Sequence, residues 1–175
     1  MAKFDYAGQL NGAANPVIRN FLIANSADVA VGEALSFSSG ALTATGGDKV
    51  LGICIGIVDS NGIDMDNTSQ TLDGTWVSST KTYTAADDNV TVLGVRAQCI
   101  CDKNALFKND SDGSITVVWE GEKFNLASGT QIDASTHVVA AGQFELVKHD
   151  PEGTSDASMG TFKICESYGD AYVQQ

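Results

Sequence analysis

Residues 29–58, VAVGEALSFSSGALTATGGDKVLGICIGIV, decide the fold class of this 175-residue chain. Apolar and polar side chains alternate through the first part of the stretch, as they do along a strand with one buried face. The residues that this alternation directs toward a core are Val29, Val31, Leu35 and Phe37. Residues 38–40 and 46–48 hold the serine, glycine and aspartate that tight turns require. The stretch therefore predicts antiparallel β-structure, closed by the apolar run of residues 50–58.

The rest of the chain continues this pattern. It contains 18 glycines, 2 prolines and 43% hydrophobic residues, a composition typical of a turn-rich globular domain. Turn signals recur about every ten residues, and no long window has the period of an amphipathic helix. Strands are expected at residues 17–23, 75–78, 90–101, 104–108, 114–119, 144–148 and 160–166, with a hairpin turn at residues 109–113. We predict an all-β fold, either a single antiparallel β-sandwich or a small β-barrel, with little helix.

Composition divides the chain into three segments. Residues 1–16 are small and polar, residues 17–167 carry the expected strands, and residues 168–175 form a short C-terminal tail. The first segment has no alternating apolar face, so we expect an extended N-terminal arm that stays outside the core of the β-domain.

A few larger side chains in and near this arm are candidate contacts with a partner. Phe4, Tyr6 and Leu10 are spaced as isolated anchors for a groove on another protein. Arg19 follows them at the start of the β-domain. We assign Phe4, Tyr6, Leu10 and Arg19 to a partner-contact site.

The acidic character of the chain restricts its partners. Its formal net charge is -12, from 22 acidic and 10 basic residues, and the basic residues are spread singly. Nucleic-acid phosphates and anionic membranes attract clustered lysine and arginine, so neither is an expected partner. The apolar run of residues 50–58 is about half as long as the ~18 residues of a membrane span. The start of the chain lacks the apolar region of a secretory signal, and we expect assembly in a cytoplasm.

Four cysteines, Cys54, Cys99, Cys101 and Cys165, have no C-x-x-C spacing and no histidine cluster near them. Cys99 and Cys101 are two residues apart on an expected strand, so their side chains face the same side. The even count allows a disulfide framework, but a chain of this size with its own core folds without one. We expect reduced thiols that act as small packing residues.

Glu120 and Glu122 lie beside Trp119, a composition found in glycosidase sites. Residues two apart on a strand share one face, whereas glycoside hydrolysis needs two carboxylates opposed across a cleft, so we expect no catalysis here. His137 and His149 have no nucleophile motif near them, and no G-x-S-x-G, P-loop or H-E-x-x-H motif occurs. We therefore predict no enzymatic activity and no cofactor.

Two acidic segments are candidates for cation binding. Residues 109–113, NDSDG, fail the EF-hand register, because its first and twelfth ligand positions would be Lys108 and Trp119. Residues 59–74 form a long acidic loop in which Asp64 and Asp66 could gather a cation, although exposed acidic loops mostly bind nothing. No metal site is predicted, and cation binding by the long loop stays open.

Residues 29–53 follow the pattern VxxGExLxFxxGxLxxTxGDxVLGI, and the last strands are expected in GQFELVK at 142–148 and GTFKI at 160–164. In these segments the chain resembles the head decoration, or cement, proteins of tailed bacteriophages and related virion proteins. The resemblance implies an all-β body that forms homo-oligomers, with a trimer favoured over a dimer. It also implies the major capsid protein as partner and a place on the capsid exterior, with arms that tie neighbouring capsomers together. No family binding residue carries over to a position in this chain.

Two other classes of protein remain open. A cell-surface or tail-associated β-sandwich, acting as an adhesin or a carbohydrate-binding module, would carry a secretion signal or an anchor. A carbohydrate-active enzyme would have a cleft with opposed carboxylates. The expected function is that of a structural virion protein that stabilises a phage head by bridging its capsomers.

Overall fold

The structure is a computed structural model, and it describes residues 3–10, 12, 15–38, 41–44, 49–70, 72–137, 142–150 and 158–165. Short β-strands are the main regular elements of this described part. These are β1 (Asp5–Gln9), β2 (Ile18–Leu22), β3 (Asp28–Ala30), β4 (Ala34–Ser38), β5 (Ala41–Ala44), β6 (Gly52–Val58), β7 (Thr75–Val77), β8 (Thr82–Thr84), β9 (Arg96–Ile100), β10 (Ala105–Asp110), β11 (Lys123–Phe124), β12 (Leu126–Ser128), β13 (Gln131–Ile132), β14 (Phe144–His149) and β15 (Met159–Ile164). The helical elements are the short turns η1 (Asn89–Leu93), η2 (Val117–Trp119) and η3 (Ala134–Thr136). No helix in the described part is long and apolar enough to cross a membrane.

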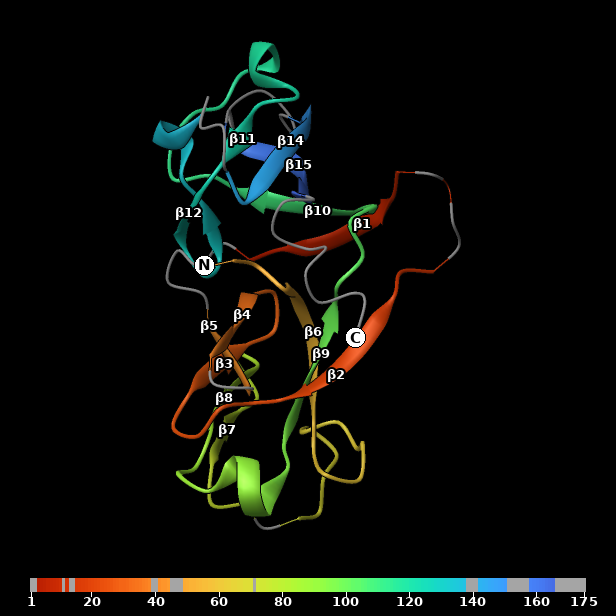
Figure 1. Cartoon of the computed structure of the whole chain (residues 1–175), viewed down its shortest axis with the longest axis vertical. Helices are drawn as coiled ribbons and strands as arrows, with labels where there is room; N and C mark the ends of the chain where they lie inside the picture. Colours follow the sequence, from red (N-terminus) through yellow and green to blue (C-terminus); the bar gives the residue numbers. More distant parts are fainter. Residues whose placement is uncertain are drawn as a thin grey trace.

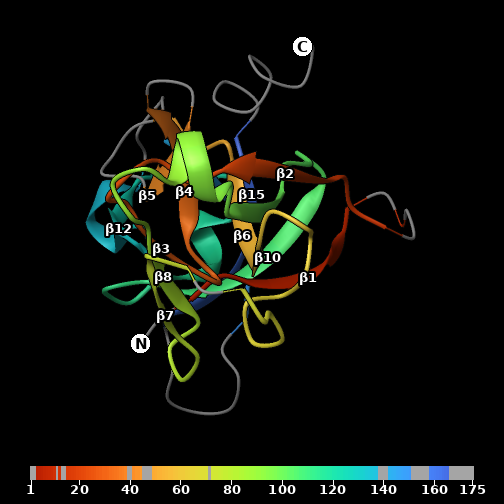
Figure 2. The same cartoon turned by 90° about the horizontal axis from the view of Figure 1, so that it is seen from below.

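The described strands form antiparallel sheets. In Figure 1 the sheet that contains β10, β14 and β15 lies above the sheet that contains β6 and β9, and β3, β8 and β7 lie beside the lower part of the latter. The upper sheet has the order β1-β10-β15-β14-β11, the middle sheet β2-β9-β6-β4-β5 and the lower sheet β3-β8-β7, while β12 pairs with β13. Figure 2 looks along the long axis from below and shows β1 and β2 extending toward the same side of the molecule. The predicted all-β antiparallel fold is confirmed, and it resembles a sandwich rather than a closed barrel.

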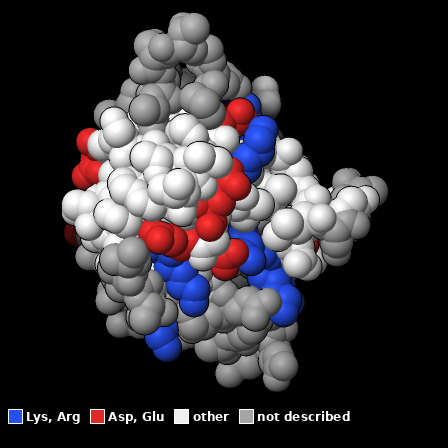
Figure 3. Space-filling view, turned by 90° about the horizontal axis from the view of Figure 1, so that it is seen from above, with Lys and Arg blue, Asp and Glu red and all other residues white. Residues whose placement is uncertain are grey.

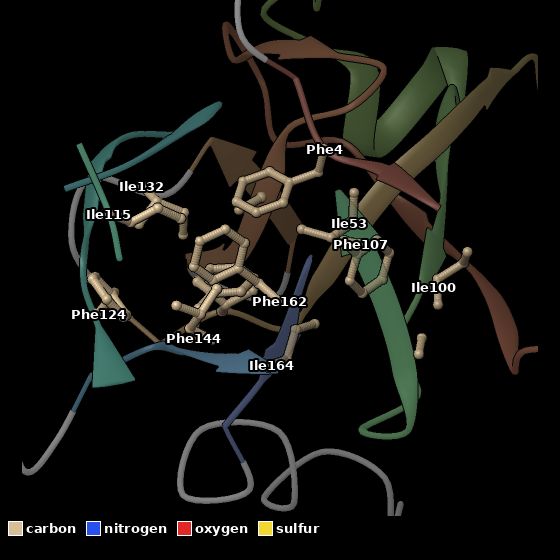
Figure 4. Close-up of a cluster of buried hydrophobic side chains, with 14 of the residues drawn as sticks. Phe4, Ile53, Ile100, Phe107, Ile115, Phe124, Ile132, Phe144, Phe162 and Ile164 are labelled. Atoms are coloured by element: carbon tan, nitrogen blue, oxygen red, sulfur yellow. The ribbon is translucent and has the colours of Figure 1, made fainter. Parts of the chain in front are cut away.

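Two hydrophobic cores lie on opposite faces of the middle sheet. Neighbouring residues of β6 belong to different cores, Ile53 to the upper and Cys54 to the lower, because successive side chains of a strand point to opposite faces. Strand β6 is therefore buried on both sides, which explains its unbroken apolar sequence. The upper core (Figure 4) contains Phe4, Ala34, Val50, Ile53, Ile100, Ala105, Phe107, Ile115, Phe124, Ile132, Ala134, Phe144, Leu146, Phe162 and Ile164. The lower core contains Ile23, Val29, Leu35, Leu42, Leu51, Cys54, Ile57, Met65, Tyr83, Ala85, Val95, Ala97, Cys99 and Cys101.

The stretch that decides the fold class contributes to the lower core as predicted. Val29 and Leu35 are fully buried there, and Val31 and Phe37 pack against it from partly buried positions. The expected final pair of strands is also present, because β14 and β15 are antiparallel neighbours. Parts of several predicted segments lie outside the described residues: 1–2, 11 and 13–14 of the expected arm, 39–40 and 46–48 of the expected turns, 71 of the long loop, and 166–175 at the C-terminal end.

The sequence predicts a strand from residue 90, but the chain forms η1 there and β9 begins at Arg96. The difference is explained by Asn89, whose buried side chain binds three backbone groups. Asn89 Nδ2 donates to Ile23 O at 2.6 Å and to Val95 O at 3.2 Å, and Asn89 Oδ1 accepts from Val95 N at 3.1 Å. Gly94, with a φ of 68°, then ends the turn in the left-handed conformation.

The predicted hairpin turn at residues 109–113 is wrong. Strand β10 continues to Asp110 and pairs with β1 and β15. Polar side chains of this segment bind the backbone of the β12–β13 region: Asn109 Nδ2 donates to Thr130 O at 2.9 Å, and Asp112 Oδ1 accepts from Ala134 N at 2.8 Å. These long-range hydrogen bonds override the local preference of Asn, Asp and Gly for a turn.

Residues 3–9 are part of the folded body and not a free arm. Strand β1 pairs with β10 in the upper sheet, and Phe4 is only 3% exposed in the upper core. The Phe4 ring stacks on Phe144, with centroids 4.8 Å apart, and meets Phe107 edge-on at 6.5 Å (Figure 4). The prediction that this segment stays outside the core is therefore wrong, because its apolar partners lie far away along the sequence.

Candidate partner-binding surface

The structure separates the four predicted contact residues. Phe4 is buried in the upper core, where its side chain supports the fold and is inaccessible to a partner. Tyr6 is 40% exposed and Leu10 is 47% exposed, although the Tyr6 ring also contacts Phe107, with centroids 6.3 Å apart. Arg19 is half-buried on β2. Tyr6 and Leu10 are thus the predicted residues that offer apolar surface to a partner.

Two further exposed apolar residues are Val17, at 49% exposure, and Ile18, at 50%. The connection between β9 and β10 holds both segments in place. Leu10 N donates to Asn104 O at 2.9 Å, and Cys101 N donates to Val17 O at 3.2 Å. Leu10 and Val17 are therefore attached to the two ends of one short connection. The apolar residues that we call the edge surface are Tyr6, Leu10, Val17 and Ile18.

The edge surface adjoins two strand edges. Among the described strands, β1 pairs with β10 alone and β2 with β9 alone. The outer side of such a strand presents N–H and C=O groups to which another strand can bind. The apolar and β-branched residues of 17–23 predict a strand, but they do not tell whether that strand lies at an edge. The exposure of Val17 and Ile18 is therefore not visible in the sequence pattern.

Most other exposed apolar side chains of the described part lie on helical turns, whereas Ile63 lies in the long acidic loop and Val77 on β7. Val117 and Val118 belong to η2 at the upper end of the molecule, and Val92, at 70% exposure, belongs to η1 at the lower end. Figure 3 views the upper end, where the described surface is mostly uncharged, with acidic and basic residues along part of it. The valines of η1 and η2 do not adjoin a strand edge, and Val77 is a single exposed apolar side chain on the edge strand β7. The edge surface differs because it combines four such side chains with the pairing groups of two edge strands.

The carboxylates considered for catalysis lie on the turn after η2, not on a strand. Glu120 Oε1 accepts a hydrogen bond from His149 N at 2.9 Å, which attaches this turn to β14. Trp119 stacks on His137, with centroids 3.8 Å apart and planes at 19°. One face of the indole is therefore covered by the imidazole and is closed to a stacking sugar ring. The arrangement stabilises the turn and offers no opposed pair of carboxylates.

The long acidic loop uses its carboxylates within the protein. Asp59 accepts hydrogen bonds from Asn61 N at 2.8 Å, Ile63 N at 2.9 Å and Thr68 Oγ1 at 2.6 Å, and the Thr68 hydroxyl is the main cause of its lowered pKa. Asp66 accepts hydrogen bonds from side chains of the β7–β8 hairpin. The donors to Asp66 are Lys81 Nζ, Ser78 Oγ at 2.6 Å and Trp76 Nε1 at 2.9 Å.

These donors lower the pKa of Asp66 to about 2, with the Lys81 hydrogen bond as the largest cause. Asp59 thus stabilises the loop internally, and Asp66 fastens the loop to the β7–β8 hairpin. Within the described residues, no three His, Cys, Asp or Glu side chains are grouped so that they could hold a metal ion.

Profiles of protein families, curated proteins and solved structures were compared with the chain, and none of them matches. The edge surface is therefore characterised by its own residues and not by those of a relative.

Proposed function

We propose that the protein is a structural component of a bacteriophage virion, which binds the outer surface of the head and bridges neighbouring capsomers. The resemblance of residues 29–53 to head decoration proteins supports this proposal. The observation that carries it is the edge surface, where apolar side chains are exposed beside two strand edges.

The edge surface suits a protein partner. Apolar side chains contribute to binding by being removed from water, and the free backbone groups of an edge strand can pair with an extended segment of the partner. On a symmetric capsid the same modest contact is repeated many times, so each copy of the protein needs only a small interface area to stabilise the capsid. The major capsid protein is the partner that we propose.

The position of β1 determines which part of the protein can connect neighbouring capsomers. Because residues 3–9 are folded into the upper sheet, they cannot reach across to a neighbouring capsomer as a free arm. We assign the bridging contact to the edge surface instead. A second copy of the chain is the other proposed partner, with a trimer favoured over a dimer. Light scattering on the purified protein tests this, because each protomer adds 18.3 kDa.

Binding to heads is tested by placing charge on the edge surface. Leu10→Asp and Val17→Asp are combined, since both side chains are about half exposed and their substitution should leave the fold intact. Val92→Asp is the matched control, because Val92 is exposed on η1, outside the edge surface. The three proteins are sedimented with heads that lack the protein, and bound and free fractions are compared.

We expect the double variant to bind about tenfold more weakly than wild type, and Val92→Asp to bind as wild type does. Wild-type affinity in the double variant would overturn the assignment to the edge surface. A wild-type protein that does not bind heads but binds host polysaccharide would overturn the proposed function in favour of a carbohydrate-binding module.

A further inference from the structure

Two cysteines face each other across the centre of the middle sheet. Cys54 of β6 is the register partner of Cys99 of β9, and both side chains are fully buried in the lower core. Cys101, two positions further along the chain, is buried in the same core. All three carry free thiols. The sheet thus gathers three thiols on one face, of which Cys54 and Cys99 are directly opposite.

The peptide groups of the two opposed cysteines point away from each other. Cys54 N donates to Glu33 O at 2.9 Å, on the side of β6 that is remote from β9. Cys101 N donates to Val17 O at 3.2 Å, on the side of β9 that is remote from β6. Peptide groups two residues apart on a strand point the same way, so those of Cys99 also face β2. Cys54 and Cys99 are therefore a non-hydrogen-bonded antiparallel pair.

Non-hydrogen-bonded pairs bring side chains closest. Their Cα atoms lie about 4.5 Å apart, within the roughly 4.4–6.8 Å that a disulfide spans. The diagonal pair of Cys54 and Cys101 is separated by about 7–8 Å, which is beyond that range. Cys99 and Cys101 lie along one strand with parallel side chains, an orientation that does not suit a bond between them. The register shift between Cys54 and Gly56 adds local twist beside the opposed pair.

We propose that Cys54 and Cys99 are a latent disulfide site, which closes when the chain folds in the presence of a small disulfide such as oxidised glutathione. One cysteine thiolate attacks the glutathione disulfide, forming a mixed disulfide and releasing one glutathione thiolate. The second cysteine thiolate attacks the protein sulfur of the mixed disulfide, forms the bond between Cys54 and Cys99, and releases the second glutathione. Two protein thiols lose two electrons and two protons, and oxidised glutathione is reduced to two glutathione molecules.

The folded protein resists the same reaction. Burial raises the pKa of the Cys54 thiol to about 12 and the pKa of the Cys99 thiol well above its usual value. Thiolate is the attacking species, so little of it forms in the native core near neutral pH. Folding from the open chain removes this obstacle, because the thiols ionise and react before they are buried. The protein therefore stays reduced in a reducing compartment and acquires the bond when it folds under oxidising conditions.

Refolding in a redox buffer tests the site. Reduced protein is unfolded in urea and refolded with a mixture of reduced and oxidised glutathione, and its remaining thiols are blocked before digestion. We expect an intact mass lower by two hydrogen atoms and a linked peptide that contains Cys54 and Cys99. The melting temperature should rise by about 5–10 °C relative to the reduced protein, because the bond restricts the unfolded chain.

Two variants identify the pair. Cys99→Ala should abolish the intramolecular bond, whereas Cys101→Ala, on the same side of the sheet, should retain it. The peptide map of the wild-type protein gives the answer even where a variant folds poorly. A bond that joins other cysteines, a bond between two chains, or a refolded wild-type protein with all thiols still reactive would each overturn the proposal.

Discussion

The two cores of this protein are built from different lengths of chain. The residues of the lower core all come from one continuous segment, residues 21–101. The upper core combines residues 105–164 with the upper face of the middle sheet and with Phe4 from the other end of the sequence. The lower core is thus self-contained in sequence, whereas the upper core is completed by an N-terminal side chain. Stability of the upper part should depend on β1 more than stability of the lower part does.

The cores also differ in their chemistry. Five phenylalanines dominate the upper core, and Phe124 meets Phe162 edge-on with centroids 5.9 Å apart. The lower core holds smaller aliphatic and thiol side chains, and buried polar groups such as Asn89 and Asp59 adjoin it. Buried polar groups also adjoin the upper core, among them Asn109 and Gln143. Loss of a ring should therefore harm the upper core most, whereas loss of a buried hydrogen bond should harm either part.

Phe4→Ala is the strongest test of this difference. Removing a buried phenylalanine should lower the free energy of unfolding by about 3–5 kcal/mol, with the loss centred on the upper core. Urea unfolding measures it, with Trp119 as the fluorescent reporter of the upper part in a Trp76→Phe background. Leu10→Ala is the control, expected to change stability by less than about 0.5 kcal/mol because its side chain is half exposed. Equal midpoints for Phe4→Ala and wild type would mean that the upper core does not need β1.

Each part of the molecule contains a buried asparagine that bonds to distant backbone. Asn89 makes three such bonds beside the lower core, and Asn109 makes two beside the upper one, to Thr130 O and Ile132 N. Asn89→Ala should cost about 3 kcal/mol and Asn109→Ala about 2 kcal/mol, because each leaves buried backbone groups unpaired. Thermal unfolding shows which of the two variants loses more stability. The reverse order would contradict the view that the number of hydrogen bonds made by the buried amide sets the loss of stability.

His137→Ala tests the upper part with a smaller change. The imidazole stacks on Trp119, so its removal should cost about 1 kcal/mol and alter the emission of Trp119. Trp76 packs against the lower core and serves as the internal reference, since its emission should stay the same. Changed emission from both tryptophans would show that the stack influences more than its own end of the molecule.

The smallest expected effect is a pair of opposite responses to pH. Hydrogen bonds lower the pKa of Asp66, so its contribution to stability is complete above its ordinary pKa near 4 and is lost as the pH falls through about 2. Burial raises the pKa of Glu33, so ionisation of Glu33 lowers stability as the pH rises above its ordinary value.

Unfolding midpoints measured against pH check both directions. Asp66→Asn should remove part of the loss of stability in acid, and Glu33→Gln should remove part of the loss on the way to neutral pH. Variants whose profiles run parallel to that of wild type would contradict these assignments.

Much of the β-structure could be predicted because its signals are local. Alternation at Val29 and Leu35, the apolar run that becomes β6, and the final pair of strands all appear in short windows of sequence. The helical turn η1 could not be predicted, because Asn89 takes its partner Ile23 O from 66 positions earlier. The turn expected at residues 109–113 is absent for the same reason, since its polar side chains bind residues near position 130.

Only part of the edge surface could be predicted from the sequence. Tyr6 and Leu10 stand out because small polar residues surround them, which does signal exposure. Phe4 has the same surroundings, yet it is buried against rings that the sequence places far away. Val17 and Ile18 have the sequence pattern of ordinary strand residues. Their exposure could not be predicted, because it depends on which strand lies at the edge of the sheet, and the sequence pattern does not show the strand order.

During synthesis, β1 leaves the ribosome long before the strand with which it pairs. Residues 21–101 can collapse into the lower core while β10 and β15 are still being made, since they supply that core alone. Strand β1 must then return to β10 over about 100 residues of chain, and pairing at such a separation is slow. Until it returns, Phe107 and Phe144 lack the ring that covers them, so the new chain is most prone to aggregate in this interval.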